Sequence, residues 1–575
     1  MFSNSLVAGA MTSSYVLVLL VLLNPTLPLE PLALLPIVLR VGAFYAASGA
    51  VVAFTLLLLR VVFGRRLFAP AWLSVTVLAW LGAAASAAGA VLMWVNIRTF
   101  ALVLDARTIA IVAQSAVILA AVSGILLITA MLQRYRLRRG WWAVWVVSTS
   151  LASVALPLVL RAQSPLAPLA ARPLGDLLDV PAPDRLAKVT VVALDAGSLE
   201  FISSAASEGR LPNFGRILDA GAVTHLATLH PTSADAVWAA IATGKLPQKN
   251  GIRSAAVYRV AGDGSGPPIQ LLPDFCFATA LLRFGILAEE PLTSASLRSR
   301  TLWAILSAAG VSVGVVNFPL TDPVPAVRGF IVSNTYVRQS QRSSTPADPA
   351  GVYPDDLRVE TSAVLREAEV SAAPDVPGAV TERQRAPARL DRIYDRLHRY
   401  LTLMHPVQVS LMRFQSLDAI GHYFLRYAMP SQFGDVTEED RRRYGGLLEA
   451  HYALVDEAIG RAIDGLGSDD LLLVVSAYGM EPLSMGKRVI ELLIGDPEVS
   501  GTHEAAPDGF LMAYGASVAR ARQLRRASVV DVLPTILYFL GLPVARDLDG
   551  FARADLFLPA FTKEHPITFI PSYDR

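Results

Sequence analysis

The chain has a single cysteine, Cys276, among its 575 residues. One thiol excludes an internal disulfide, and it leaves no CxxC pair and no zinc-finger spacing. The formal net charge is only +2 at pH 7 with neutral histidines, so no overall basic character points to nucleic acid as a partner. Any part of the chain outside the cytoplasm must therefore be stable without disulfide bonds.

Acidic side chains are nearly absent from the first 160 residues, and the apolar excess of the chain (53% overall) is concentrated there. Five apolar segments each approach the ~20 residues that a helix needs to cross a bilayer. They cover about residues 5–23, 36–59, 72–95, 109–132 and 141–161. Buried helices of a soluble protein are the less favoured alternative. No charged residue lies near the centre of a segment, so transport is not favoured over an anchor or a docking surface for membrane-protein partners.

Arginine-rich short loops predict the orientation of these segments. The N-terminus has no basic region typical of a cleaved signal peptide. The loops after the second and fourth segments contain Arg60, Arg65, Arg66, Arg134, Arg136, Arg138 and Arg139. Because such loops stay in the cytoplasm, we expect a multi-pass protein of the cell membrane. Its N-terminus is cytoplasmic, and the chain after about residue 165 is extracytoplasmic.

The remainder of the chain alternates buried strands with helices. A transmembrane bundle over 1–165 and a linker rich in Pro and Ala over 166–187 precede this domain, which covers 188–575. Continuous apolar runs predict strands at 189–194, 311–317, 329–333, 407–414, 471–476 and 509–513. This pattern is typical of an α/β domain with a mainly parallel sheet. We expect cap insertions over the sheet edge at about 253–300 and 340–395.

Several polar residues follow these strands, where ligands of such sheets bind. Asp418 and His422 are spaced i and i+4 on a predicted helix, and with His503 they form a ligand set suited to Zn²⁺. Taken alone, His422 is more typical of a helix-surface or capping histidine than of a metal ligand. Asp195 is either a metal carboxylate or a helix N-cap. Thr232 and Ser233 either cap a helix or present a hydroxyl at an anion-binding helix start.

The order of several motifs resembles the alkaline phosphatase superfamily, and within it the type I phosphodiesterase/nucleotide pyrophosphatase group. The motifs are LDAGS, LPNFGRILDAGA, PTSADAVWAAIATGKLPQKNGI, SLDAIGHYF, VVSAYGM and SGTHEAAPDGFLMAYG. The resemblance runs from about residue 187 to the C-terminus. It implies an alkaline-phosphatase-like fold with two zinc ions, a Thr or Ser nucleophile between them, and cleavage of phosphoesters through a phospho-enzyme.

The resemblance transfers to this chain only in part. The first zinc site corresponds to Asp418, His422 and His503, and Asp195 matches one carboxylate of the second. The Asp-His pair of the second site corresponds to Ala477 and Tyr478, and the nucleophile to Ala234. We therefore expect one zinc ion at most and a catalytically impaired subunit that binds a phosphoester or lipid ligand, or assembles with other proteins. The alternative is an active zinc-dependent phosphodiesterase or phosphotransferase, with Ser233 as a substitute nucleophile or with direct attack by water.

Overall fold

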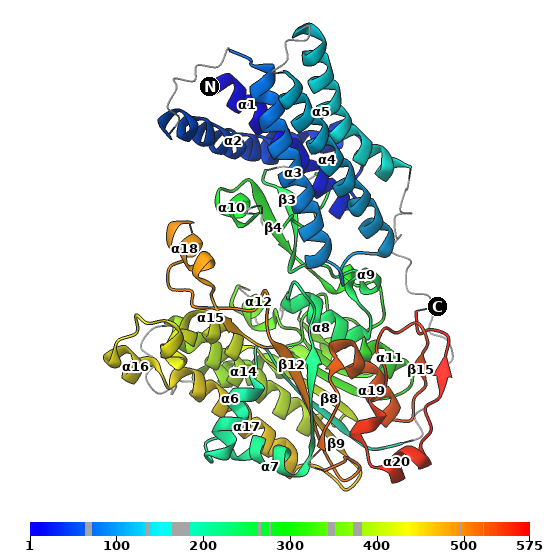
Figure 1. The fold of residues 1–575 in the computed structure, drawn as a ribbon. Coiled ribbons are helices and arrows are strands. Elements are labelled where there is room, and N and C mark those ends of the chain that lie inside the picture. Colours follow the sequence, from blue (N-terminus) through cyan, green and yellow to red (C-terminus); the bar gives the residue numbers. More distant parts are fainter. Residues whose placement is uncertain are drawn as a thin grey trace. The chain divides into compact units, whose positions relative to one another are not determined.

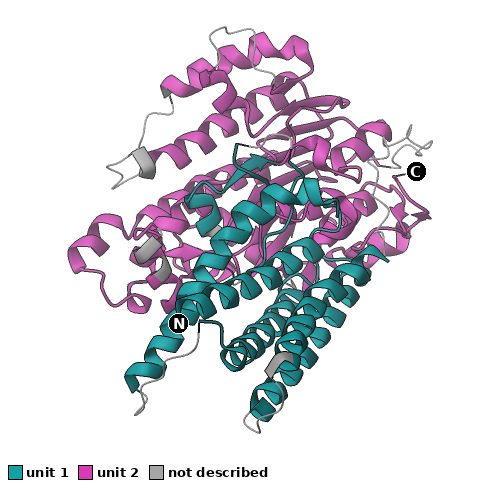
Figure 2. Cartoon of the chain, turned by 90° about the horizontal axis from the view of Figure 1, so that it is seen from above, with its two compact units in different colours: residues 1–170, 256–291 teal, residues 171–255, 292–575 magenta. Residues whose placement is uncertain are grey.

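The computed structural model describes residues 1–63, 72–133, 139–163, 185–262, 266–274, 276, 278–342, 351–371, 382–494, 496–520 and 522–574. The chain divides into two compact units. One unit comprises residues 1–170 and 256–291, and the other comprises residues 171–255 and 292–575 (Figure 2). Residues 256–291 therefore interrupt the α/β part of the chain in sequence but belong to the helical unit.

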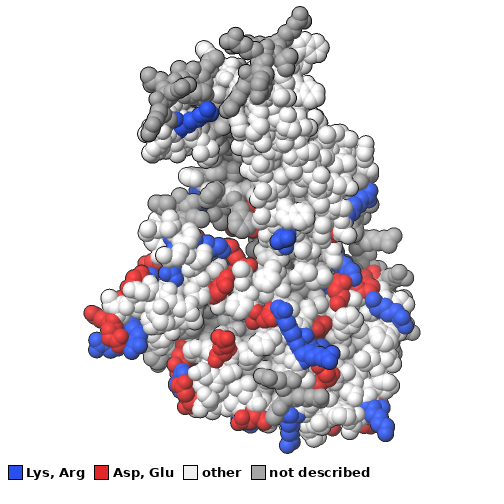
Figure 3. All heavy atoms as spheres, in the orientation of Figure 1, with Lys and Arg blue, Asp and Glu red and all other residues white. Residues whose placement is uncertain are grey.

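Five helices of the first unit are, within the described residues, long and apolar enough to cross a membrane. They are α1 (Phe2–Leu23), α2 (Pro31–Phe63), α3 (Val75–Thr99), α4 (Ala106–Leu132) and α5 (Arg139–Ala162) (Figure 1). Four of them contain a predicted segment, and α3 covers all but the first three residues of the segment 72–95. On the face drawn in Figure 3 these helices show few charged side chains, whereas acidic and basic residues are intermixed on the α/β unit. The predicted linker up to residue 184, and the arginines 65, 66, 134, 136 and 138, lie outside the described residues.

Residues 256–291, which lie within the predicted insertion at about 253–300, pack against α1 and α2. Strand β3 (Ala256–Val260) pairs antiparallel with β4 (Leu287–Pro291), and helix α10 (Ala278–Arg283) precedes β4. The shared core consists of Val16, Leu20, Ile37 and Val41 from the helices and Val260, Ile269, Leu281 and Leu287 from the insertion. The apolar residues of the insertion are thus buried against the membrane-length helices.

The second unit contains a mixed sheet that, among the described residues, has ten strands in the order β13-β2-β12-β9-β1-β8-β5-β6-β7, with β14 beside β2. The central strand β1 (Val189–Leu194) is parallel to both neighbours, β8 (Val409–Phe414) and β9 (Leu471–Tyr478). The predicted runs also form β5 (Val313–Val316), β6 (Gly329–Val332) and β12 (Asp508–Tyr514). This confirms an α/β domain with a mostly parallel sheet.

Two strands, β12 and β7, run antiparallel to their neighbours in the sheet. Strand β12 runs antiparallel to β9 and to β2 (Ala222–Ala227), and β7 runs antiparallel to β6. Short strands at the edge complete the sheet. They are β7 (Val352–Tyr353), β13 (Arg522–Gln523) and β14 (Ala527–Ser528). The parallel centre still brings the carboxyl ends of β1 and β8 to one edge, which is where the candidate site residues follow.

Alternate residues of β1 enter two separate cores, as expected for a strand with helices on both sides. Val189, Val191 and Ala193 face one core, and Val192 and Leu194 face the other. The first core is shared with α8 (Ala234–Thr243), α11 (Leu302–Ala308) and α19 (Val532–Phe539). The second is shared with α14 (Glu382–Met404), α15 (Ser416–Ala428) and α17 (Leu447–Asp464).

The segment 340–395 is not a separate cap in the residues that are described. It contains α12 (Tyr336–Arg342) in part, α13 (Arg358–Ser371) and the first half of α14. Helix α14 packs against β5 and β8 and buries Ile393, Tyr394, Leu397 and Leu401 in the core. These four residues recur at helical spacing and form one apolar face of a helix that is otherwise rich in arginine.

Candidate metal centre

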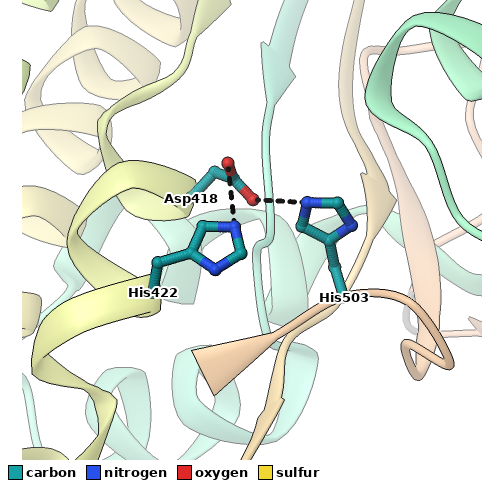
Figure 4. Close-up of side chains that lie close together, drawn as sticks. All are labelled: Asp418, His422 and His503. Atoms are coloured by element: carbon teal, nitrogen blue, oxygen red, sulfur yellow. Dashed lines mark ion pairs between the residues drawn. The ribbon is translucent and has the colours of Figure 1, made fainter. Parts of the chain in front are cut away.

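Asp418, His422 and His503 converge at the carboxyl edge of the sheet. Helix α15 begins two residues after β8 and carries Asp418 and His422 one turn apart, and His503 follows β11 (Gly501–Thr502). The Nε2 atom of His422 lies 3.7 Å from Oδ2 of Asp418, and Nε2 of His503 lies 3.7 Å from Oδ1 of the same carboxylate (Figure 4). One ligand atom from each residue lies within 4.8 Å of the others, so the three could hold a metal ion.

The hydrogen bonds of the two histidines favour the form that binds a metal. Nδ1 of His422 donates to the carbonyl oxygen of Gly501 at 2.9 Å, and Nδ1 of His503 donates to that of Thr232 at 3.2 Å. A proton on each Nδ1 leaves the lone pair of each Nε2 directed toward Asp418. These contacts also fix the orientation of both rings.

Asp418 completes the set as a carboxylate with unused bonding capacity. Its Oδ1 atom is buried and accepts no hydrogen bond from the described residues. Burial raises the pKa of the Asp418 carboxyl, while His422 and His503 act in the opposite direction. A buried acceptor without a donor is costly, and a divalent cation between the three residues would remove that cost. The donor set of one carboxylate and two imidazoles fits Zn²⁺.

Asp195, which follows β1, is paired with an arginine, so its carboxylate is not free to bind a metal ion. Nε of Arg413 donates to Oδ1 of Asp195 at 3.0 Å, and Nη2 of Arg413 donates to Oδ2. Nε1 of Trp238 donates to Oδ1 at 2.7 Å. Asp195 and Arg413 are 2% and 7% exposed. The bidentate pair uses both oxygens of the carboxylate, and the helix start nearby is capped by Ser198 instead of Asp195.

Arg413 is a site residue that the sequence analysis did not identify. It lies in β8 opposite Ala193 of β1, so its side chain reaches the carboxylate that follows β1. Burial disfavours the charged guanidinium, but the Asp195 carboxylate outweighs burial and raises the pKa of Arg413. The signal in the sequence was a single charged residue within a mainly apolar strand.

Ala477 and Tyr478 end strand β9 and are both fully buried. The ring of Tyr478 lies 5.0 Å from the ring of His503, and its hydroxyl has no hydrogen-bond partner among the described residues. Burial, followed by the carboxylates of Asp195 and Asp418, raises the pKa of Tyr478 well above its ordinary value. A neutral aromatic ring therefore stands beside the candidate ligand set.

Ala234, the position to which the family resemblance assigns the nucleophile, is the first residue of α8. Neither of the two preceding residues caps the helix through its side chain, contrary to the capping interpretation. The hydroxyl of Thr232 donates to the carbonyl oxygen of Leu229 at 2.8 Å, and that of Ser233 is buried without a partner among the described residues. The first N–H groups of α8 are thus not covered by a side-chain cap.

Comparison with known proteins identifies the class to which this fold and site belong. The model of the type I phosphodiesterase / nucleotide pyrophosphatase family matches residues 189–498, and the chain belongs to this family. No curated protein matches the chain.

Solved structures of the same kind of protein are similar to part of the chain. Murine ectonucleotide pyrophosphatase / phosphodiesterase 5 is 11% identical, with a TM-score of 0.36, covering 64% of this chain and 100% of its own. An inactive variant of the murine protein in complex with AMP is 12% identical (TM-score 0.38; 65% and 100% covered). The human protein is 11% identical (TM-score 0.38; 64% and 99% covered).

Proposed function

We propose that this chain is a membrane-anchored, extracytoplasmic member of the family that binds one metal ion and a phosphoester or anionic head group, without transferring phosphoryl groups to itself. The observation that carries this proposal is the buried pair of Arg413 and Asp195. The guanidinium occupies both oxygens of the carboxylate that a second metal would require. Two metals are needed to clamp the attacking and leaving oxygens of an in-line displacement.

Asp418, His422 and His503 would hold the single ion, and zinc is the ion that their donor atoms favour. When bound, the ion supplies a Lewis acid that attracts a phosphate oxygen. The start of α8 is tied to this set, because Nδ1 of His503 donates to the carbonyl of Thr232. The uncapped N–H groups of α8 are suited to a second phosphate oxygen. The methyl group of Ala234 cannot act as a nucleophile.

An active phosphodiesterase is the second candidate, and one observation favours it. The hydroxyl of Ser233 is buried, has no hydrogen-bond partner among the described residues, and precedes the nucleophile position by one residue. If Ser233 attacked phosphorus, Ser233→Ala would abolish turnover and leave metal content unchanged. If turnover relied on water instead, Ser233→Ala would retain it.

Metal analysis together with a phosphodiesterase assay tests the proposal on the full-length protein. We expect one metal per chain, no cleavage of generic phosphodiesters, and loss of the metal in His503→Ala. His225→Ala, which removes an exposed histidine on β2, is the matched control and should keep the metal. Two tightly bound ions with turnover would contradict the proposal and support the active enzyme.

A further inference from the structure

A cavity of about 260 Å³ lies in the α/β unit away from the candidate metal centre. Its floor is formed by the first four residues of β1 and by Ser410, Met412 and Phe414 along one face of β8, and its walls come from α14 and α17. Asp195 and Asp418 follow the carboxyl ends of the same strands. The volume is slightly below the ~300–1,000 Å³ of typical ligand pockets, so a compact ligand would fit.

The floor of the cavity is polar where a buried sheet is normally apolar. Thr190 and Ser410 are direct neighbours in the register of β1 and β8, and both line the cavity. Above them, Nε2 of His398 is buried and has no hydrogen-bond partner among the described residues. Burial, the largest influence, lowers the pKa of His398 to about 4, so the ring is neutral at physiological pH. The cavity thus contains two strand hydroxyls and one unpaired imidazole nitrogen.

Charged residues around the cavity are mainly basic. Lys188, Arg399 and Arg461 line it together with one carboxylate, Asp395. Asp395 accepts from Nη2 of Arg461 at 2.8 Å and lies 3.1 Å from Nε of Arg399. The two guanidinium groups therefore share a single carboxylate. A guanidinium has five N–H donors, and one shared partner leaves donors of both available. With His398 neutral, the surroundings carry an excess of two positive charges.

The side chains of Arg399 and Arg461 are 52% and 40% exposed, so they stand at the solvent-facing side of the cavity. An entering anion meets these guanidinium groups before it reaches the hydroxyls of Thr190 and Ser410. Planar guanidinium groups bind carboxylates and phosphates through paired hydrogen bonds. The apolar side chains of Val192, Met412 and Phe414 complete the lining, and they suit a short carbon skeleton.

We infer that this cavity is a second binding site, which takes a compact organic anion bearing a phosphate or carboxylate group. The anionic group pairs with Arg399 and Arg461, and the polar remainder contacts His398, Thr190 and Ser410. The inference does not depend on the metal centre or on the proposed function, because the two sites share no lining residue.

Calorimetric titration of the full-length protein with inorganic phosphate, and separately with succinate, tests this site. A chelator is present throughout, so that the Asp418 set cannot contribute a metal-bound anion. We expect saturable binding of at least one probe, weakened about tenfold by Arg461→Gln, since a hydrogen bond to a charged group is lost. Ser410→Ala should weaken binding by a smaller factor. Because this change leaves the ion pairs of Asp395 intact, it tests the site even if Arg461→Gln misfolds.

Arg441→Gln is the matched control, because it removes the same charge from an arginine of α16 (Glu438–Tyr444) that does not line the cavity. It should bind the probes as the wild type does. No saturable binding of either probe, or equal affinity in the wild type, Arg461→Gln and Ser410→Ala, would overturn the inference. Binding that is lost in His503→Ala but retained in Arg461→Gln would also overturn it, by placing the anion at the metal centre.

Discussion

The guanidinium of Arg413 and the carboxylate of Asp195 depend on each other because both are buried. Removing one partner of a buried ion pair leaves an uncompensated charge and costs about 3–5 kcal/mol, whereas replacing both is far less costly. We expect Arg413→Met to lower the free energy of unfolding by that amount, and Asp195→Asn with Arg413→Met to recover most of it. Denaturant unfolding of the α/β unit measures both. An unchanged stability in Arg413→Met would show that Asp195 has another partner.

The ion pair of Arg413 and Asp195 also determines which substitutions are needed for a second metal ion to bind. Ala477→Asp, Tyr478→His and Ala234→Thr together supply the side chains that the family resemblance implies. We expect these three changes alone to leave metal content at one ion per chain, because Arg413 still occupies Asp195. Adding Arg413→Ala should raise the content toward two ions, measured by elemental analysis. A second ion in the triple variant would mean that Arg413 yields to the metal.

His451 makes stability depend on pH. It lies in α17, is fully buried, and neither ring nitrogen has a hydrogen-bond partner among the described residues. Burial lowers its pKa from 6.5 to about 4, so the unfolded chain binds the proton more tightly than the folded chain. Stability is therefore full above pH 6.5 and is lost as pH falls toward 4, by roughly 2–4 kcal/mol.

Replacing this ring with an apolar side chain should remove part of that slope. We expect His451→Leu to reduce the difference in unfolding temperature between pH 7 and pH 5 by about half. The remaining difference is due to His398, whose pKa is also lowered to about 4. Thermal unfolding across this pH range makes the comparison. If the unfolding temperature of His451→Leu depended on pH as steeply as that of the wild type, the pH dependence would come from groups other than His451.

At the scale of elements, side-chain hydrogen bonds add to the apolar core through which residues 256–291 pack against the helices. Oδ1 of Asn24 accepts from the backbone N–H groups of Gln270 and Leu271, each at 2.8 Å, and its Nδ2 donates to the carbonyl of Leu271. Asn96 forms a similar pair with the backbone of Asp274. The side chains of Asn24 and Asn96 thus form hydrogen bonds with the backbone of the insertion, as a neighbouring strand would.

Cys276 reports on this docking because it is the only cysteine and is 7% exposed. Burial raises its pKa to about 12, so the reactive thiolate is scarce. We expect Asn24→Ala to accelerate modification by a maleimide severalfold, since the backbone groups of the insertion lose their partners. Thr129→Ala, which removes a hydrogen bond within α4 only, is the control and should label at the wild-type rate. Equal rates in all three proteins would contradict the role of Asn24.

The elements differ in how far the sequence alone could predict them. Continuous apolar runs predicted the central strands, because a strand buried on both faces has no polar alternation to obscure it. Strand β2 has two adjacent polar residues, Thr224 and His225, so it lacks a continuous apolar run, and the apolar face of α14 lies among arginines in the sequence. Arg413 and Asp195 are 218 residues apart, and their pairing depends on a strand register that no local pattern encodes. The convergence of Asp418, His422 and His503 was predictable because each follows or precedes a predicted strand, whereas their binding of a metal remains a prediction.

At the scale of the whole molecule, the orientation of the helices decides where the α/β unit works. The arginines between α2 and α3 and between α4 and α5 predict that these connections stay in the cytoplasm. A reporter enzyme that is active only outside the cytoplasm should work when fused after residue 574, and should be silent when inserted between α2 and α3. The reverse pattern would place the α/β unit in the cytoplasm and contradict the proposed location.

A cation that is part of the chain does not exchange with its surroundings. The charge that Arg413 places beside Asp195 is present from the moment of synthesis, and neither dilution nor a chelator can withdraw it. The edge of the sheet near β1 therefore keeps its electrostatic balance in zinc-poor and zinc-rich media alike. Under the proposed function, a changing supply of metal ions acts on this edge through Asp418, His422 and His503.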